Sequence, residues 1–183
     1  MTGTSYDRTF EVEALAVIDF EASSLSQESW PIEVGLSWIE AGEIRTWSSL
    51  IRPHESWLIE DWSAKSASVH RIPFEDLMGA PNAGSVAHEF ASVIAARTLV
   101  SDAPRYEAQW LARLLTAGDL RSDMPVLDYH DISFSLFEGY SLDMLYEMLE
   151  RRPVPHRAGP DSARLAAGWL KAQQVDNGDQ RNP

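Results

Sequence analysis

The segment Leu15–Ala22 (LAVIDFEA) restricts the fold most, because it is an apolar run that carries two acids only near its end. Such a run is typical of a buried strand, which needs other elements to cover it. Residues 31–40 and 43–53 are also predicted as strands, and Ala41 and Gly42 between them predict a hairpin turn. Three successive strands therefore open the chain.

The remainder of the chain alternates helical and strand patterns. The predicted elements are a short helix near 73–78, a helix at 85–97, a strand at 98–101, a helix at 106–117, a strand at 125–129, and helices at 141–152 and 161–174. An antiparallel meander followed by alternating helices and strands predicts an α/β fold, with a mixed five-stranded sheet flanked by helices.

Length and composition indicate one globular domain. The chain has 183 residues, of which 44% are hydrophobic, and it contains no cysteine, which excludes disulfides and thiolate chemistry. We expect an N-terminal arm at 1–11, a single domain at 12–174 and a frayed tail at 175–183. No apolar run approaches the roughly 20 residues that span a bilayer. The polar start lacks a hydrophobic signal region, so we expect a cytoplasmic location and no membrane partner.

The charge balance is strongly acidic. There are 28 Asp and Glu against 15 Lys and Arg, a formal net charge of −13. This balance disfavours sequence-independent binding to long nucleic acid, which needs a basic surface. It is compatible with a site whose carboxylates gather metal cations.

Asp19 and Glu21 are the first candidate site residues. Side chains alternate along a strand, so these two acids share a face about 7 Å apart, close enough to share a pair of metal ions. They lie at the carboxyl end of their strand, where sites form in open α/β sheets. The alternative is that paired acids are common in so acidic a chain, as at Glu11 and Glu13.

Glu107 falls on the apolar arc of its predicted helix, between residues such as Trp110 and Leu111. A carboxylate on a buried face is costly unless it is paired or metal-bound, which favours a site role. The alternative is that an acid in the first helical turn interacts with the helix dipole. Asp102 is a rival for the same role, although it could equally cap the helix.

Asp161 and His156 lie close together near the end of the chain. Asp161 follows Pro160, so it could be a helix N-cap, but it also lies on the small and apolar side of the last helix. His156, five positions earlier in a loop, could act as a base near neutral pH or be merely solvated. The other four histidines are predicted to be solvated: His54, His70, His88 and His130.

Placed in order, these residues resemble the DEDDh family of 3′-to-5′ exonucleases, which includes polymerase proofreading subunits, ribonuclease T and oligoribonuclease. The resemblance spans about residues 13–172 and rests on five segments: VIDFEASSL at 17–25, PIEVG at 31–35, VHRI at 69–72, LVSDAPRYEAQWL at 99–111 and HRAGPDSA at 156–163. The first, fourth and fifth look like the three motifs of the family.

The chain departs from the family pattern at four positions. Glu107 stands where the family has Asp, and Asp102 stands where it often has Asn. Arg71 replaces a glycine in the histidine segment, and Ala22 stands where Thr commonly follows the first-motif Glu. Glu keeps the charge of Asp but reaches one methylene further, so metal geometry would differ.

The resemblance implies a ribonuclease H-like fold with two divalent cations, Mg²⁺ or Mn²⁺. It implies that Asp19 bridges the two ions, that Glu21 and Asp161 complete the coordination, and that Glu107 contributes directly or through water. His156 is then the general base that takes the proton of the attacking water.

The resemblance also implies contacts to the terminal nucleotide from Ala22 and Leu25, the latter as a wedge against the base. The expected partners are single-stranded DNA or RNA, or short oligonucleotides, and a homodimer is left open. Five aromatic residues could stack on bases or pack in the core: Trp57, Trp62, Phe134, Phe137 and Tyr140.

The expected function is therefore a metal-dependent 3′-5′ exonuclease. The alternative is a catalytically degenerate exonuclease-like module that binds nucleic acid or regulates another activity. Two further alternatives are an interaction domain that its acids keep soluble, and hydrolysis of some other phosphodiester.

Overall fold

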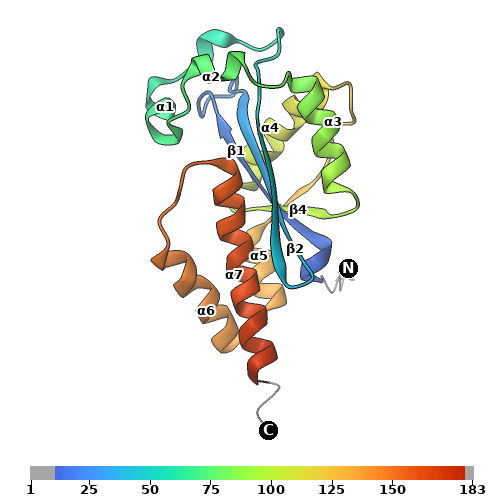
Figure 1. Cartoon of the computed structure of the whole chain (residues 1–183), viewed down its shortest axis with the longest axis vertical. Helices are drawn as coiled ribbons and strands as arrows, with labels where there is room; N and C mark the ends of the chain where they lie inside the picture. Colours follow the sequence, from blue (N-terminus) through green and yellow to red (C-terminus); the bar gives the residue numbers. More distant parts are fainter. Residues whose placement is uncertain (1–10, 180–183) are drawn as a thin grey trace, which may run out of the picture.

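The structure is a computed structural model, and it describes residues 11–179. The expected N-terminal arm, apart from residue 11, and the last four residues of the expected tail lie outside the described residues. Figure 1 shows an elongated molecule in which a twisted sheet runs through the centre and helices lie against it.

The sheet has five strands in the order β3-β2-β1-β4-β5. Their bounds are β1 Leu15–Ala22, β2 Pro31–Glu40, β3 Glu43–Leu50, β4 Thr98–Ser101 and β5 Val126–Asp128. β2 is antiparallel to both β1 and β3, whereas β4 is parallel to both β1 and β5. The predicted mixed five-stranded α/β fold is confirmed, and β1 lies at its centre.

Seven α-helices and two short 3-10 helices complete the described part of the chain. Their bounds are η1 Val12–Ala14, η2 Ile59–Asp61, α1 Ala64–His70, α2 Phe74–Met78, α3 Ala83–Ile94, α4 Pro104–Ala117, α5 Tyr129–Leu136, α6 Gly139–Arg151 and α7 Ala158–Asp179. The sequence predicted neither α1 nor α5. It also made α7 too short, since the helix begins before Pro160 and continues past the expected end at residue 174.

The alternation of β1 divides the interior into two cores. Ala16, Ile18 and Phe20 pack in one core with residues of α3 and α4. Leu15 and Val17 pack in the other core with residues of α5, α6 and α7. A strand covered on both faces must be apolar on both faces, which explains the unbroken hydrophobic character of its first half.

Gly35 on β2 allows α7 to begin very close to the sheet. A Cβ atom at this position would lie 2.1 Å from the carbonyl oxygen of Ala158, well inside van der Waals contact, so only glycine fits. One turn further on, the hydroxyls of Ser37 and Ser162 are 2.9 Å apart and hydrogen-bonded. The first turn of α7 is therefore fixed against β2.

Candidate active site

A cleft of about 510 Å³ opens at the carboxyl end of β1. It is bounded by the end of β1, the loop that follows, α1, the start of α4 and the segment that leads into α7. All the site residues proposed from the sequence line this cleft, and so does the rival acid: Asp19, Glu21, Ala22, Leu25, Asp102, Glu107, His156 and Asp161.

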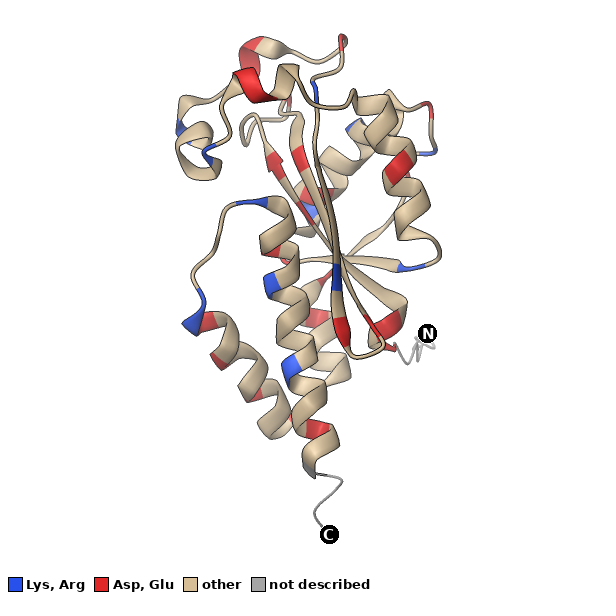
Figure 2. Cartoon of the chain, viewed as in Figure 1, with Lys and Arg blue, Asp and Glu red and all other residues tan. Residues whose placement is uncertain are grey.

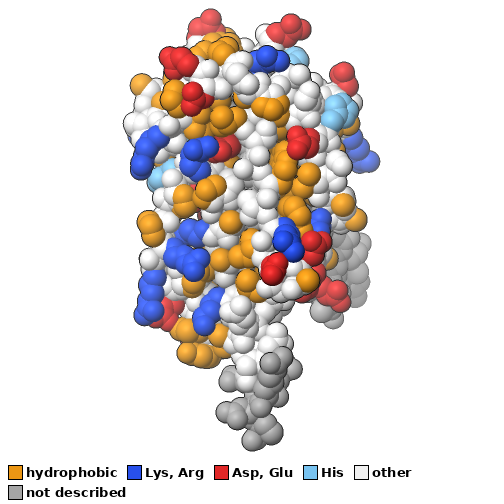
Figure 3. Space-filling view, viewed as in Figure 1, with side chains coloured by type: hydrophobic (Ala, Val, Ile, Leu, Met, Phe, Trp, Pro, Cys, Tyr) orange, Lys and Arg blue, Asp and Glu red, His pale blue; other side chains and the backbone are white. Residues whose placement is uncertain are grey.

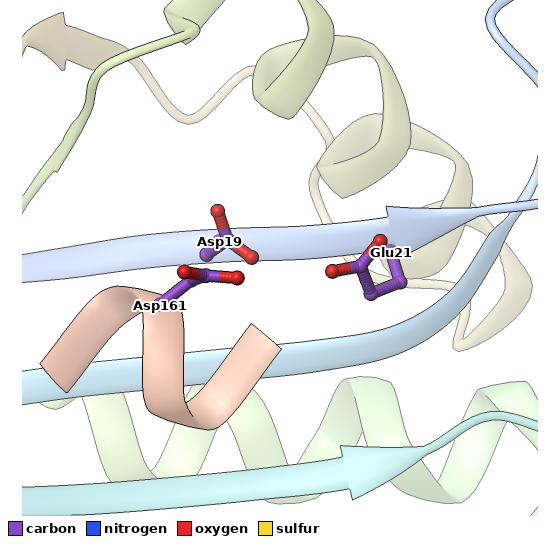
Figure 4. A group of neighbouring side chains, drawn as sticks. All are labelled: Asp19, Glu21 and Asp161. Carbon is purple, nitrogen blue, oxygen red and sulfur yellow. The ribbon is translucent and has the colours of Figure 1, made fainter. Parts of the chain in front are cut away.

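Three carboxylates converge most closely. Asp19 and Glu21 project from β1 and Asp161 projects from α7, and each offers an oxygen within 4.8 Å of the others (Figure 4). Asp19 and Glu21 lie on the same face of the strand, as the period of two predicts. The β1–β2 register shifts between Glu21 and Ala22, so the regular ladder is interrupted where the acids are displayed.

Asp161 lies one turn inside α7, because the helix begins at Ala158. The N-cap alternative is therefore wrong. The Asp161 side chain is 8% exposed, and its Oδ2 accepts a hydrogen bond of 3.0 Å from the backbone N–H of Arg157. Its Oδ1 is buried and has no partner within residues 11–179. One oxygen is thus held by the helix start, and the other is left for a ligand.

Glu107 approaches the same cleft from α4. It is 3% exposed, as its place on the apolar arc predicted. The parallel pairing of β1 with β4 ends at Val17 and Val100, which leaves the later part of β1 free on that edge. The Phe20 backbone N–H on this edge donates to the Glu107 carboxylate, whose Oε2 has no partner in the described chain. Asp102 is exposed at the rim of the cleft.

The crowding of these acids changes their protonation. Burial raises the pKa of Asp19 well above its usual range, and the charges of Asp161 and Glu21 add to that effect. Burial, with Asp161 and Glu33 nearby, raises the pKa of Glu21 to about 8. Burial also raises the pKa of Glu107, with Asp19 as the largest charge contribution. Such a cluster is unfavourable when ionised unless it holds cations.

The donor set fits a divalent metal. Carboxylate oxygens are the ligands that Mg²⁺ and Mn²⁺ prefer. The buried and unpartnered oxygens of Asp161 and Glu107 show that hydrogen bonds within the described chain leave ligand positions free. The three converging acids of the cluster, Asp19, Glu21 and Asp161, could therefore hold a metal ion.

His156 lines the cleft directly before α7. Its backbone is in the left-handed region, with φ of 56°, and its side chain is partly exposed. Its charge acts on Asp161, opposing the increase that burial causes in the pKa of that carboxyl. The structure thus places the imidazole beside the acid cluster with access to solvent.

Glu33 is an important residue that the sequence analysis did not single out. It is 4% exposed on β2, and its carboxylate accepts hydrogen bonds of 2.9 and 2.7 Å from the Arg157 guanidinium. It also accepts a hydrogen bond of 3.0 Å from the Ala158 backbone N–H. This bidentate pair fixes the start of α7, and with it Asp161 and His156. The PIEVG segment was the available signal, but the sequence analysis used it only as a strand.

His70 corrects a prediction, because it is buried and not solvated. It is 3% exposed, lines the cleft, and accepts a 3.0 Å hydrogen bond at Nδ1 from the Ile72 backbone N–H. Burial lowers its pKa, so it is neutral at physiological pH and carries its proton on Nε2. The VHRI segment contained this information, but a lone histidine gives no sign of its burial.

Leu25 is 70% exposed at the edge of the cleft. The loop that carries it is held by Asp61, which accepts hydrogen bonds of 2.5 Å from Ser24 and 2.8 Å from Ser26. Ala22, by contrast, is 7% exposed and presents only a small surface to the cleft.

The aromatic residues considered for base stacking do not line this cleft. Trp57 and Phe137 are buried in the two cores, and Trp62 packs partly buried against the first. Phe134 and Tyr140 are 62% and 63% exposed, but they lie outside the cleft. Core packing therefore explains three of the five.

Comparison with known proteins identifies the family. Residues 16–167 match the family model RNase_T, described as Exonuclease. The chain belongs to this exonuclease family. The match confirms the resemblance that the sequence motifs indicated, and the family hydrolyses phosphodiester bonds in nucleic acid. No curated protein matches the chain.

Solved structures of exonucleases share the ribonuclease H-like fold. One is a 3′-exonuclease that recognises the 3′ end of a histone mRNA stem-loop, with a TM-score of 0.65, 17% identity, and coverage of 88% of this chain and 81% of that one. Exonuclease X, bound to 5′-overhanging duplex DNA, has a TM-score of 0.58 and 18% identity, with coverage of 89% of this chain and 93% of that one. E. coli exonuclease I, bound to a dA16 oligonucleotide, has a TM-score of 0.65 and 11% identity, with coverage of 87% of this chain and 40% of that one.

None of the described helices is both long enough and apolar enough to cross a membrane.

Proposed function

We propose that the protein is a divalent-cation-dependent 3′-5′ exonuclease that removes nucleotides from single-stranded DNA or RNA, or from short oligonucleotides. The observation that supports this most strongly is the convergence of three carboxylates, from residues 19, 21 and 161, within 4.8 Å. The buried carboxylate of Glu107 lines the same cleft. Family membership supplies the reaction class, and the cleft supplies the residues that carry it out.

Asp19, Glu21, Asp161 and Glu107 would hold the two divalent cations, Mg²⁺ or Mn²⁺. When bound, the cations supply a nucleophilic water at neutral pH and stabilise charge on the attacking and leaving oxygens. Asp19 is central among the four, because the charges of Asp161 and Glu21 act on its carboxylate and its own charge acts on that of Glu107. It would therefore contribute most to holding the cations.

His156 accepts the proton of the attacking water. It is the histidine beside Asp161, and its partial exposure allows that proton to pass on to solvent. Asp161 is next to Ser162, whose hydroxyl is hydrogen-bonded to Ser37 of β2. The Glu33–Arg157 pair fixes the segment that carries His156. The base and one metal ligand are thus positioned by the same structural unit.

The terminal nucleotide would lie between the acid cluster and the loop after β1. Leu25 packs against the base of this nucleotide. Ala22 makes a small contact with it, at the position where the family commonly has the hydroxyl of a threonine. The related structures bound to an oligonucleotide, to overhanging DNA and to a stem-loop support a nucleic-acid end as substrate.

An end-labelled oligonucleotide assay tests the proposal. Single-stranded DNA and RNA, labelled at the 5′ end, should give a ladder of progressively shorter products with Mg²⁺ or Mn²⁺ and none with EDTA. The same substrates labelled at the 3′ end should release labelled mononucleotide at once, which establishes the direction. Asp19→Ala should abolish both patterns.

If neither wild type nor Asp19→Ala forms any product with Mg²⁺ or with Mn²⁺, the exonuclease proposal is contradicted. That result would favour a degenerate module that only binds nucleic acid. Ladders of equal strength from wild type and Asp19→Ala would show that hydrolysis comes from elsewhere.

A further inference from the structure

Two further hollows adjoin the acid cleft in succession along α7 and make a line of three with it. The second hollow, about 460 Å³, shares Arg164 with the cleft, and the third, about 220 Å³, shares Arg152 with the second. Both lie beside α7, one next to the segment that precedes it and the other next to the end of α6. We call the second and third hollows together the basic groove.

The charge of this groove is opposite to that of the chain as a whole. Four basic residues line it, and its one acid, Glu147, is paired with Arg151: the four are Arg151, Arg152, Arg164 and Lys171. The whole chain has 28 acids against 15 Lys and Arg, so this ratio is reversed locally. Figures 2 and 3 show Lys and Arg along α7 and at the end of α6, whereas the rest of α6 carries Asp and Glu.

Not all of these cations serve the fold. The Arg164 guanidinium donates to the backbone carbonyls of Leu149 and Arg152, and so caps the end of α6. Arg152 and Lys171, in contrast, are exposed and form no salt bridge within residues 11–179. Two exposed cations without carboxylate partners, in a chain so rich in acids, are available for an anion.

The groove is continuous with the site and has a suitable length. Lys171 lies ten residues after Asp161 on α7, which places it about 15 Å along the helix axis. That span is comparable with a few nucleotides of a stacked strand, which rises roughly 3.4 Å per nucleotide along its axis. Lys65 extends the basic lining to the α1 side of the cleft.

We propose that the basic groove binds the phosphodiester backbone of the single strand on the 5′ side of the nucleotide being removed. This inference rests on the proposed function. Repulsion from the acid cluster would keep the strand away from the cleft without cations, whereas Arg152 and Lys171 attract its upstream phosphates. The arrangement also gives a length preference, since a dinucleotide cannot reach the groove.

The test uses the full-length chain on an Asp19→Asn background, so that binding is measured without hydrolysis. Arg152→Gln/Lys171→Gln is compared with the matched control Arg52→Gln/Arg121→Gln, which removes two exposed arginines that line neither the cleft nor the groove. Fluorescence anisotropy follows dT12 and U12 with Mn²⁺ over a salt series. In parallel, each of the two double variants is also made without the Asp19→Asn substitution, and its hydrolysis of dT2 and dT12 is measured.

The groove variant should bind the 12-mers about fivefold to tenfold more weakly, and its slope of log affinity against log salt should fall by about 1.4. Its hydrolysis of dT2 should stay within about twofold of wild type, and the control should match wild type throughout. Equal weakening by the control, an unchanged slope, or no binding by the parent protein would overturn the inference. Stronger and equally groove-dependent binding of a duplex would overturn the single-strand assignment. If the groove variant loses binding but no protein hydrolyses any substrate, the groove stands and the exonuclease proposal falls.

Discussion

The acid cleft and the basic groove are adjacent, yet they solve opposite electrostatic problems. In the cleft, Asp19, Glu21 and Asp161 are buried close together and their pKa values are raised, so the ionised cluster is stable only when it binds cations. In the groove, Arg152 and Lys171 form no salt bridge with any residue that the structure describes, so they can bind an anion. The net charge of the whole chain reveals neither the acidic cleft nor the basic groove. A chain of charge −13 can still carry a surface suited to nucleic acid, provided that the charges are segregated.

The largest expected effect separates the two regions completely. Asp19→Asn should lower kcat by about 10⁴-fold, because it removes the carboxylate at the centre of the cation cluster. Affinity for a 12-mer in Mn²⁺ should fall by less than about threefold, since the groove is intact. Single-turnover kinetics and anisotropy measure the two quantities. Asp131→Asn, an exposed acid outside the cleft, is the control and should change neither.

The next effect concerns the acid that the cleft receives from α4. Glu107→Ala should lower kcat by about 10²-fold, whereas Asp102→Ala at the exposed rim should change it by less than about threefold. Without metal, Glu107→Gln should raise Tm, because it removes a buried carboxyl group whose Oε2 has no partner within residues 11–179. Steady-state kinetics and thermal melts check both. A larger kinetic loss from Asp102→Ala would assign the role to the rim acid instead.

A smaller effect should reach both regions at once. Gly35→Ala places a methyl group against the Ala158 carbonyl and must push the start of α7 away from β2. We expect a loss of about 2 kcal/mol in stability, about tenfold in kcat and about twofold in 12-mer affinity, because cleft and groove share this helix. Gly42→Ala, at a turn with open space around it, is the comparison. Its positive φ should cost stability only. Unchanged kcat in a folded Gly35→Ala variant would show that the close packing of α7 on β2 does not position the site residues.

The smallest effect is a pH dependence confined to the cleft. The raised pKa values mean that the folded, metal-free protein binds protons that the unfolded chain has lost. Its stability should therefore be greatest at and below the ordinary carboxyl pKa and fall as pH rises, with the contribution of Glu21 lost as pH passes through its pKa of about 8. We expect Tm to drop by about 5 °C between pH 5.5 and 8.5 in EDTA. Saturating Mn²⁺ should remove or reverse the drop, and a flat EDTA profile would contradict the crowding.

The elements that the sequence predicted are those whose information is local. β1 was predicted from its apolar run, and the hairpin after it from two strand patterns joined by a turn at Ala41 and Gly42, all at nearly the observed bounds. The helical wheel predicted that Glu107 is buried, and the motif resemblance predicted its role in the site. α1 was missed because AKSASVH has no apolar period, and the helix depends on the Ser63 cap that accepts from the Ser66 N–H.

What the sequence did not predict involves partners far apart in the chain. Glu33 and Arg157 are 124 positions apart, and nothing in either segment names the other. Pro160 suggested a helix start and thereby misplaced Asp161, because proline is also tolerated within a first turn. The groove was invisible for the same reason, since Arg152 and Lys171 become neighbours only when α6 and α7 pack together.

The seat of α7 on β2 also has a consequence for the order of synthesis. The central strand emerges from the ribosome first, but the helix that brings Asp161 to it is made about 140 residues later. A nascent chain can therefore pair its first strands before Asp161 has been made. On the proposed assignment, the acid cluster is complete only once α7 has docked on β2.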